Sequence, residues 1–218
     1  MNVAFPGVTV SLTSEALVVC SERPLCTLSS SVVGGGIIQT RCIVNCHVHK
    51  DYDNRNPASD LLTFARSHGL PTPFVGLMTA AYLERACAST VHDGAMTVAA
   101  LVTAGVGNLA APGLSLPARL VPGTINTVLL VDGNLSPAAM VNAVVTASEV
   151  KARVLLERAM RTSDGYPATG TSTDAVVVAC TGRGDPLSYA GPMTHVGWLI
   201  GRSVHQALDE SLRKGEGG

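Results

Sequence analysis

The sequence predicts an α/β fold of the α+β type, a single domain in which a mixed β-sheet is layered with α-helices. Short runs rich in valine and isoleucine, separated by Gly, Pro and Ser, fill the N-terminal part and are typical of strands. Strands and helices then alternate without a strict βαβ repeat. Charged residues make up only 14% of the 218 residues and apolar residues 46%, so much of the chain must be buried.

The first half of the chain is expected to hold three strands and two helices. The strands are predicted at residues 3–12, 15–21 and 40–49. Three glycines between the last two, Gly34 to Gly36, indicate a β-bulge or a close backbone approach. Residues 57–69 predict a helix, because Pro57 suits a first turn and Gly69 a C-terminal cap. A second helix is predicted at 77–90 from the spacing of its apolar residues.

The second half is expected to hold three strands, at 95–108, 123–134 and 175–180, and two helices. The clearer helix spans 136–160, with Ser136 as N-cap and Pro137 in the first helical position. Its packed face is predicted to consist of Val141, Val144, Val145, Ser148, Ala152 and Leu155. The last helix is predicted at 193–212. We expect one domain over residues 1–213 and a frayed tail at 214–218.

Composition excludes several classes of protein. The net charge of −1 and the lack of a basic stripe argue against nucleic-acid binding, and aromatic residues, at 4%, are too few for a base-stacking platform. No run of about 20 predominantly apolar residues predicts a membrane span. The start of the chain lacks the features of a signal peptide, and the six cysteines lie mostly in apolar segments. We therefore expect a soluble cytoplasmic protein with reduced thiols.

The segment "CIVNCHVH" carries four potential metal ligands, Cys42, Cys46, His47 and His49. Their spacing fits no zinc motif. On a strand, Cys42 and Cys46 share a face with Val44, which indicates a core rather than a metal site. We expect no bound metal, and a metal-dependent hydrolase that uses Cys46, His47 and His49 is the alternative.

Polar clusters lie at the ends of the apolar runs, and the ends of strands are where a sheet commonly forms a binding site. They are "NCHVHKDYDNRNP", "GLMTA", "VGNLAAPG" with "PGTINT", and "ATGTSTD". The hydrolase motifs G-x-S-x-G and H-E-x-x-H are absent, as is a Walker lysine loop. The residues alone therefore predict a small-molecule site and name no reaction.

Longer motifs add a resemblance. The run from Pro122 to Leu155, then "ATGTSTDAVVVAC" and "YAGPMTHVGWLIGRSV", is similar to the adenosylcobinamide amidohydrolase family. The upstream motifs "GGG", "IVNCHVHKDYDNRNP", "VGLMTA" and "AGVGN" occur in that family's order, so the resemblance covers residues 34–204. It implies hydrolysis of the amide that joins aminopropanol to the corrin ring, giving adenosylcobyric acid for the salvage of coenzyme B12.

Amide hydrolysis needs an attacking oxygen, a base and donors for the developing oxyanion. His47 and His49 are the first candidates for the base, because an imidazole titrates near neutral pH, and on a persisting strand they would share a face. Glu149, at the margin of an apolar helix face, is the rival base. Backbone N–H groups around Thr171 are expected to face the carbonyl, and a covalent route through a hydroxyl of this loop is the alternative.

The remaining candidates suit binding of an amide-rimmed, cationic corrinoid through hydrogen bonds and charge. They are Asn45, Lys50, Asp51, Tyr52, Thr79, Asn108, Asn126, Thr169, Gly170, Thr173 and Asp174. No cofactor is expected to be required, since the cobalt corrinoid is the substrate. We expect no nucleic-acid or membrane partner. The sequence is compatible with a homo-oligomer. A corrinoid carrier without turnover is the alternative function.

Overall fold

A computed structural model describes residues 1, 3–117 and 124–216. Eight strands join one mixed sheet, which confirms the predicted fold class. They are β1 Val8–Leu12, β2 Ala16–Ser29, β3 Gly36–His47, β4 Val75–Thr79, β5 Cys87–Asp93, β6 Met96–Ala104, β8 Ile125–Val131 and β11 Ala175–Cys180. Two short ribbons pair β7 Leu109–Ala110 with β10 Gly170–Thr171, and β9 Asn134–Leu135 with β12 Pro186–Leu187. The α-helices of the described residues are α1 Pro57–Ser67, α2 Pro137–Glu157 and α3 His195–Glu216, and η1 Leu83–Arg85 is a short 3₁₀ helix.

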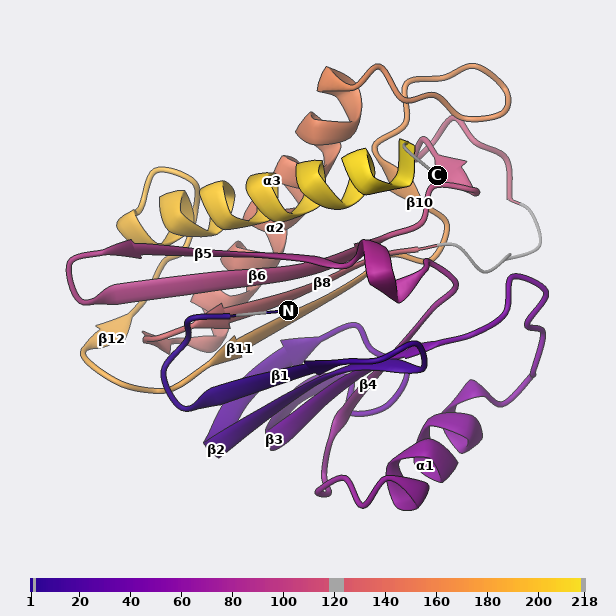
Figure 1. The fold of residues 1–218 in the computed structure, drawn as a ribbon. Helices are drawn as coiled ribbons and strands as arrows, with labels where there is room; N and C mark the ends of the chain where they lie inside the picture. The colour runs from indigo at the N-terminus through magenta and orange to yellow at the C-terminus, as the bar shows by residue number, and fades with distance from the viewer. Residues whose placement is uncertain (2, 118–123, 217–218) are drawn as a thin grey trace.

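The sheet has the strand order β4-β3-β2-β11-β8-β6-β5, and β1 is added beside β2. The pairs β3–β4 and β8–β11 are parallel and the other pairs are antiparallel. β2 belongs to two regions of the sheet: its first part pairs with β1 and its last part with β11, and its register against β3 shifts between Cys20 and Leu25. The two regions, β1–β4 and β5–β6–β8–β11, are seen one above the other in Figure 1.

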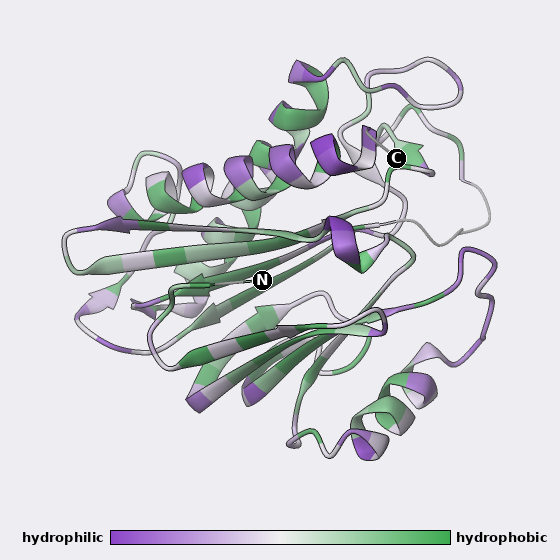
Figure 2. Ribbon diagram, viewed as in Figure 1, coloured by the Kyte–Doolittle hydropathy of each residue, from purple (hydrophilic) through white to green (hydrophobic). Residues whose placement is uncertain are grey.

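Three apolar clusters form the core. One lies between the β6–β8–β11 region and helices α2 and α3, and includes Leu129, Val178 and Leu199. The second lies between the two regions of the sheet and includes Ile43 and Leu101. The third lies between β3 and α1. Figure 2 shows the apolar colour running along the strands, while the outer side of α3 is polar.

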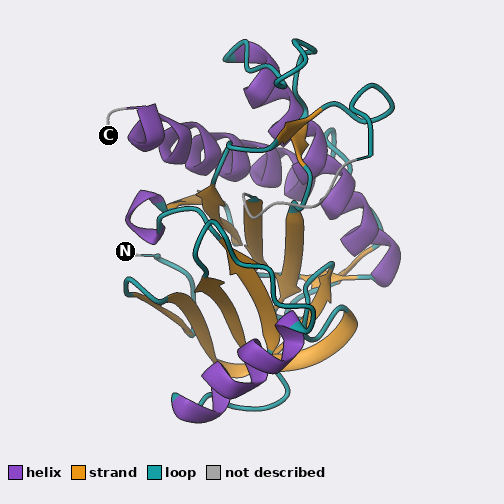
Figure 3. Ribbon diagram, turned by 90° about the vertical axis from the view of Figure 1, so that its right-hand side faces the viewer, coloured by secondary structure: helices purple, strands orange, loops and turns teal. Residues whose placement is uncertain are grey.

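The helices cover the two outer faces. Turned by 90°, the molecule shows α1 on one side of the strands and the α2–α3 pair on the other (Figure 3). Both outer faces of the strands are thus covered by helices. No helix among the described residues is long and apolar enough to cross a membrane.

Helix termini were predicted well from local chemistry. The hydroxyl of Ser136 accepts a hydrogen bond from the Ala139 N–H at 3.1 Å, and Pro137 begins α2. α1 begins at Pro57, and Gly69 follows its end with a φ of +61°. α3 continues to Glu216, so the prediction of a frayed tail is wrong for residues 214–216, and residues 217–218 lie outside the described part. The predicted strand at 123–134 also begins on a residue, Gly123, outside the described part.

The helix predicted at 77–90 is wrong. That segment holds the end of β4, the turn of η1 and the start of β5. β5 pairs with β6 along its whole length, from Cys87 opposite Val102 to Asp93 opposite Met96. This long-range pairing outweighs the weak helical preference of the small residues in the segment.

The packed face of α2 also differs from the prediction. Val141 and Val145 are exposed, and the buried residues are Ala139, Met140, Ala143, Thr146, Ala147, Val150, Val154 and Leu155. The buried face includes Ala139, Ala143 and Ala147, and it packs against α3 and the β6–β8–β11 region of the sheet. Leu155 lies on this face as predicted, whereas Val141 and Val145 point away from these neighbours.

The glycine run has the close-approach role that was expected. Gly34 has a φ of +70°, and a Cβ there would lie 2.5 Å from the Phe74 carbonyl oxygen. The register shift of the sheet falls in β2 instead, at residues 21–24.

Candidate active site

The space between the two sheet regions changes from apolar to polar at one end. On the inward face of β3, Ile43 is followed by Asn45 and then His47, because alternate residues of a strand share a face. The inward faces of β4 and β6 end in Thr79 and Thr103, and that of β8 begins with Asn126. These polar residues come together where the two regions meet.

Two buried asparagines join the regions. The Asn126 amide donates to Asn45 Oδ1 at 2.9 Å and to the Met78 carbonyl at 2.8 Å. The Asn45 amide donates to the Thr103 hydroxyl at 2.9 Å. Each asparagine is 2% exposed. The Asn45 amide is thus hydrogen-bonded to both Asn126 and Thr103, and its role in substrate binding stays a prediction.

A cavity of about 450 Å³ opens beside Asn126. It has polar and apolar walls, contributed by β4, by the segment between β2 and β3, by the loop before α1, and by the residues that precede β8 and β11. Five predicted binding residues line it: Tyr52, Thr79, Asn126, Thr173 and Asp174. The sequence thus identified residues of one cavity that come from four separate segments.

Asp174 has the most hydrogen bonds of these residues. Its carboxylate accepts the N–H groups of Thr171 and Ile125, each at 3.0 Å, and the Thr171 hydroxyl. The ammonium of Lys151, on α2, completes the set with an ion pair. A carboxylate offers about four lone-pair positions, so Asp174 has none left for the substrate. Its predicted binding role gives way to one of holding the loop.

The donors expected in the threonine-rich loop are already engaged. The Thr171 N–H donates to Asp174, and the Ser172 N–H to the Asn108 carbonyl at 3.3 Å. The oxyanion role predicted for the Thr171 N–H therefore does not fit this conformation. Thr169 and Asn108 lie at the β7–β10 ribbon, outside the residues that line the cavity, and the Asn108 amide donates to the Ser172 hydroxyl at 2.6 Å. Gly170 packs against Asp174 and Lys151.

His47 lines an adjoining cavity of about 340 Å³, which shares Val48, Tyr52 and Met78 with the first. Its Nδ1 lies 3.1 Å from the Ala81 carbonyl oxygen, and a carbonyl can only accept. Nδ1 therefore acts as the donor in this hydrogen bond, so in a neutral ring Nε2 would be the nitrogen that can accept a proton. Tyr82 stacks on the ring, with centroids 6.1 Å apart. These two contacts orient the His47 ring.

Tyr52 separates the two cavities. Its hydroxyl donates to Asp60 on α1 at 2.7 Å. Desolvation and this hydrogen bond raise the pKa of Tyr52 to about 12, and the same bond lowers the pKa of Asp60. The phenol is therefore protonated at neutral pH and serves as a hydrogen-bond donor, while Asp60 is ionised.

His49, Lys50 and Asp51 lie outside both cavities. β3 ends at His47, so His49 falls in the loop before α1 and does not share the inward face with His47. His49 pairs with Asp51 at 3.3 Å, with side chains 73% and 75% exposed. Figure 2 shows this segment in the polar colour. The prediction that both histidines line one cleft is wrong, because the strand does not persist that far.

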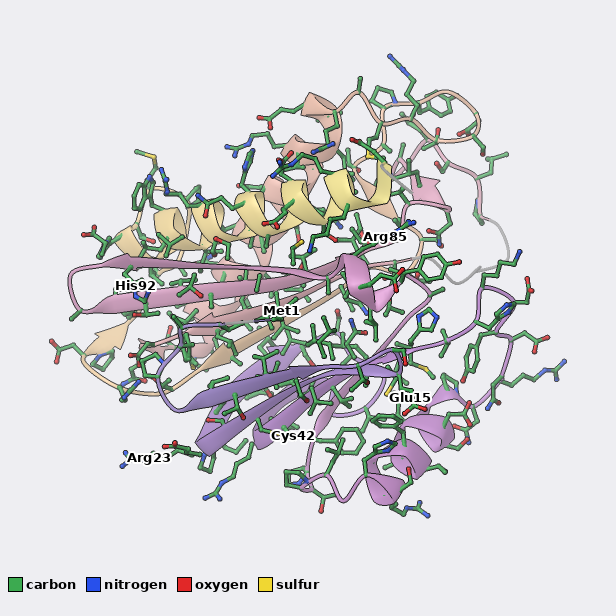
Figure 4. The ribbon with its side chains drawn as sticks, viewed as in Figure 1. Met1, Glu15, Arg23, Cys42, Arg85 and His92 are labelled. Atoms are coloured by element: carbon green, nitrogen blue, oxygen red, sulfur yellow. The ribbon has the colours of Figure 1, made fainter. Side chains whose placement is uncertain are left out.

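The cysteines fit the predicted core. Cys42 and Cys46 pack in the cluster between β3 and α1, opposite in direction to His47, and burial raises the pKa of each thiol to about 12. Figure 4 labels Cys42 in this region of the sheet. In the residues that the structure describes, no group of three His, Cys, Asp or Glu side chains could hold a metal ion.

Comparison with known proteins identifies the family. The model of the adenosylcobinamide amidohydrolase family matches residues 5–217. The adenosylcobinamide amidohydrolase of Methanosarcina mazei is 32% identical over 84% of this chain and 88% of its own length. The chain belongs to the adenosylcobinamide amidohydrolase family. A protein of the same name from Halobacterium salinarum is 41% identical over 53% of this chain and 50% of its own length.

A solved structure is also similar to this member of the adenosylcobinamide amidohydrolase family. The PH0078 protein of Pyrococcus horikoshii covers 96% of this chain and 80% of its own, with a TM-score of 0.47 and 13% identity. A likeness this distant carries no argument about the site.

Glu149 is the predicted site residue most clearly separated from the others. In this member of the family it lies on the exposed side of α2, in a groove between α2 and α3. Arg153, four residues further along the helix, pairs with Glu157 at 3.3 Å. Glu149 does not line the cavity of Asn126 and Asp174, and its role as the rival base stays a prediction.

Sequence reasoning missed Lys151, Thr103, Thr124 and Asp60. One signal for Lys151 was present, because it lies four residues after Ala147 and three before Val154, on the buried face of α2. Thr124 donates to the Thr173 carbonyl at 2.7 Å and to Asn126 Oδ1 at 3.1 Å. The sequence does not indicate that Thr124 contacts Thr173 or that Thr103 contacts Asn45, because these partners are 49 and 58 residues apart.

Proposed function

We propose that this chain hydrolyses the amide that links aminopropanol to the corrin ring of adenosylcobinamide, releasing aminopropanol and adenosylcobyric acid. Membership in the amidohydrolase family supplies the reaction class. The proposed location of the active site rests on one observation: Asn126, Thr79 and Thr173 line one cavity, and His47 lines the adjoining one. The family does not favour the alternative of a carrier without turnover.

The size of the cavity suits the arm of the substrate rather than the whole molecule. Its volume of about 450 Å³ is at the low end of ligand sites, which span about 300–1,000 Å³. A corrin macrocycle with its amide rim is larger than such a site. We therefore place the aminopropanol arm inside and the macrocycle over the mouth, where Ser30, Asp53 and Asn54 line the rim.

The chemistry is a direct attack by water. Nε2 of His47 takes a proton as the water oxygen bonds to the amide carbon, and the hydroxyls of Thr79 and Thr173 donate to the developing oxyanion. The C–N bond then breaks, and the imidazolium returns the proton to the leaving nitrogen. Thr79 suits this role because its oxygen already accepts the Ala81 N–H at 3.0 Å, so its own proton is available.

Several further expectations belong to this proposal. We propose that turnover requires no added cofactor or metal ion and no macromolecular partner, and that the enzyme works in the cytoplasm as a monomer or a homo-oligomer. The free state of its six cysteines supports the location. Activity that survives exhaustive chelation, and fractionation of the host cell, would test these points.

The decisive experiment measures products. Purified protein is incubated with adenosylcobinamide, and mass spectrometry follows aminopropanol and adenosylcobyric acid. We expect both in equal amounts, with one ¹⁸O in the new carboxylate when the reaction runs in H₂¹⁸O. Tight corrinoid binding without release would contradict the proposal and support the carrier.

A further inference from the structure

Lys151 occupies an unusual place for a lysine. It lies on the buried face of α2, and its side chain is 17% exposed. Its ammonium forms an ion pair with Asp174, whose side chain is 12% exposed. A buried ion pair seldom adds net stability over an apolar pair of the same size, because both charges lose their hydration. Another role must account for this pair.

The position of Asp174 shows what the pair holds. Its carboxylate connects the start of β8, through the Ile125 N–H, with the β10 end of the threonine-rich loop, through the Thr171 N–H. Asn126, which follows Ile125, and Thr173, which precedes Asp174, both line the cavity. Thr124 adds a second connection by donating to the Thr173 carbonyl and to Asn126 Oδ1. Asp174 thus fixes two walls of the site relative to each other.

Gly170 gives independent evidence that the pair has a defined place. A Cβ built on Gly170 would lie 2.6 Å from Asp174 Oδ2 and 2.9 Å from Lys151 Nζ. Gly170 has no positive φ, so no backbone requirement explains the glycine. The missing side chain leaves the room that the ion pair occupies.

We propose that Lys151 is a positioning residue for amide hydrolysis: it holds Asp174, and through Asp174 the walls that carry Asn126 and Thr173. The inference rests on the proposed function. Lys151 lies outside the cavity lining and acts only through Asp174. Loss of its charge leaves the carboxylate without a counterion, so the loop is free to shift, and misplacement by about 1 Å can cost on the order of 10²-fold in rate.

The test compares Lys151→Ala with Arg153→Ala, a matched change on the exposed side of the same helix. We expect Lys151→Ala to lower kcat by about 10- to 100-fold, with little change in KM. Added ethylammonium should restore part of kcat by placing a cation next to Asp174. Arg153→Ala should stay within about twofold of wild type and show no rescue. A thermal melt confirms that both variants are folded.

Hydrogen exchange at the Thr171 amide gives a readout that needs no turnover. Exchange should become faster in Lys151→Ala, slow again with ethylammonium, and stay unchanged in Arg153→Ala. Gly170→Ala, which crowds the pair from the other side, should lower kcat in the same direction. Unchanged exchange, or a kcat of Lys151→Ala equal to wild type, overturns the proposal. If the wild-type protein releases no aminopropanol, the proposed function fails first, and unaltered exchange would show separately that Lys151 does not order the loop.

Discussion

Two cavities of similar volume differ in how their polar groups are held. The groove between α2 and α3, of about 480 Å³, contains Glu149, Arg153 and Arg202 on exposed helix faces. The site cavity, of about 450 Å³, rests on buried asparagines and threonines that are hydrogen-bonded to one another across the sheet. Volume therefore does not distinguish the two. The site is marked by polar groups whose positions are fixed from several directions.

The ion pairs of the two regions show the same contrast. Arg153 and Glu157 are 57% and 54% exposed, and such a surface pair contributes about 0–1 kcal/mol to stability. Lys151 and Asp174 are mostly buried, and their pair connects α2 with the start of β8 and with the threonine-rich loop. The two ion pairs thus differ in burial and in the backbone groups that their partners connect.

The largest effect should separate two histidines that are two residues apart. We expect His47→Ala to lower kcat by about 10²-fold or more, because it removes the base at Nε2. His49→Ala, the matched control in the exposed loop, should stay within about twofold of wild type. Steady-state release of aminopropanol measures both. Equal rates in the two variants would show that His47 is not the base.

The asparagine pair should matter more to stability than Asn142, a partly exposed amide on α2. Asn126→Ala leaves the Asn45 Oδ1 and the Met78 carbonyl without a donor, so we expect the free energy of unfolding to fall by about 1–3 kcal/mol. Asn142→Ala, on α2, should change it by less than about 0.5 kcal/mol. Urea denaturation measures both, and similar values would mean that the buried network adds nothing to the fold.

A smaller, pH-dependent effect is expected at Tyr52. Its pKa is raised from 10.0 to about 12, so its contribution to stability is complete below pH 10 and is lost as the pH rises through 12. Tyr52→Phe should therefore be slightly less stable than wild type at pH 8, and the difference should shrink between pH 10 and 12. The exposed Tyr189→Phe serves as control in thermal melts. A difference that stays constant with pH would contradict the hydrogen bond to Asp60.

The smallest effect is expected in the groove. Glu149→Gln should leave kcat within about twofold and the free energy of unfolding within about 0.5 kcal/mol, because the carboxylate is exposed and far from the cavity lining. The same turnover assay and urea titration apply. A large loss of activity would return Glu149 to the list of bases and remove the contrast between the two cavities.

The fold was predictable where local chemistry decides it. Ser136 and Pro137 begin α2 as expected, and the alternation through Cys42 and Cys46 identified the face of β3 that packs on α1. The segment 77–90 could not be predicted, because its pairing with β6 is a contact between strands rather than a local preference. The prediction of the packed face of α2 failed for a similar reason, because packing against α3 determines which side of α2 is buried.

The sequence predicted some of the residues that line the proposed site, but not their roles. Tyr52, Thr79, Asn126, Thr173 and Asp174 line one cavity, as the polar ends of apolar runs indicated. Asn45 and Asp174, however, are surrounded by partners up to 81 residues away in sequence, and only the folded chain shows that their hydrogen-bonding capacity is used. The role of each residue depends on its hydrogen-bond donors and acceptors, and these partners cannot be read from the sequence.

The strand Ala16–Ser29 contributes to both regions of the sheet, and its pairing with β3 slips at residues 21–24. Because side chains alternate along a strand, an insertion of two residues at the slip would keep the inward row of side chains inward, whereas an insertion of one residue would turn that row outward. The length of this short segment therefore determines which side chains of β2 enter the core between the two regions.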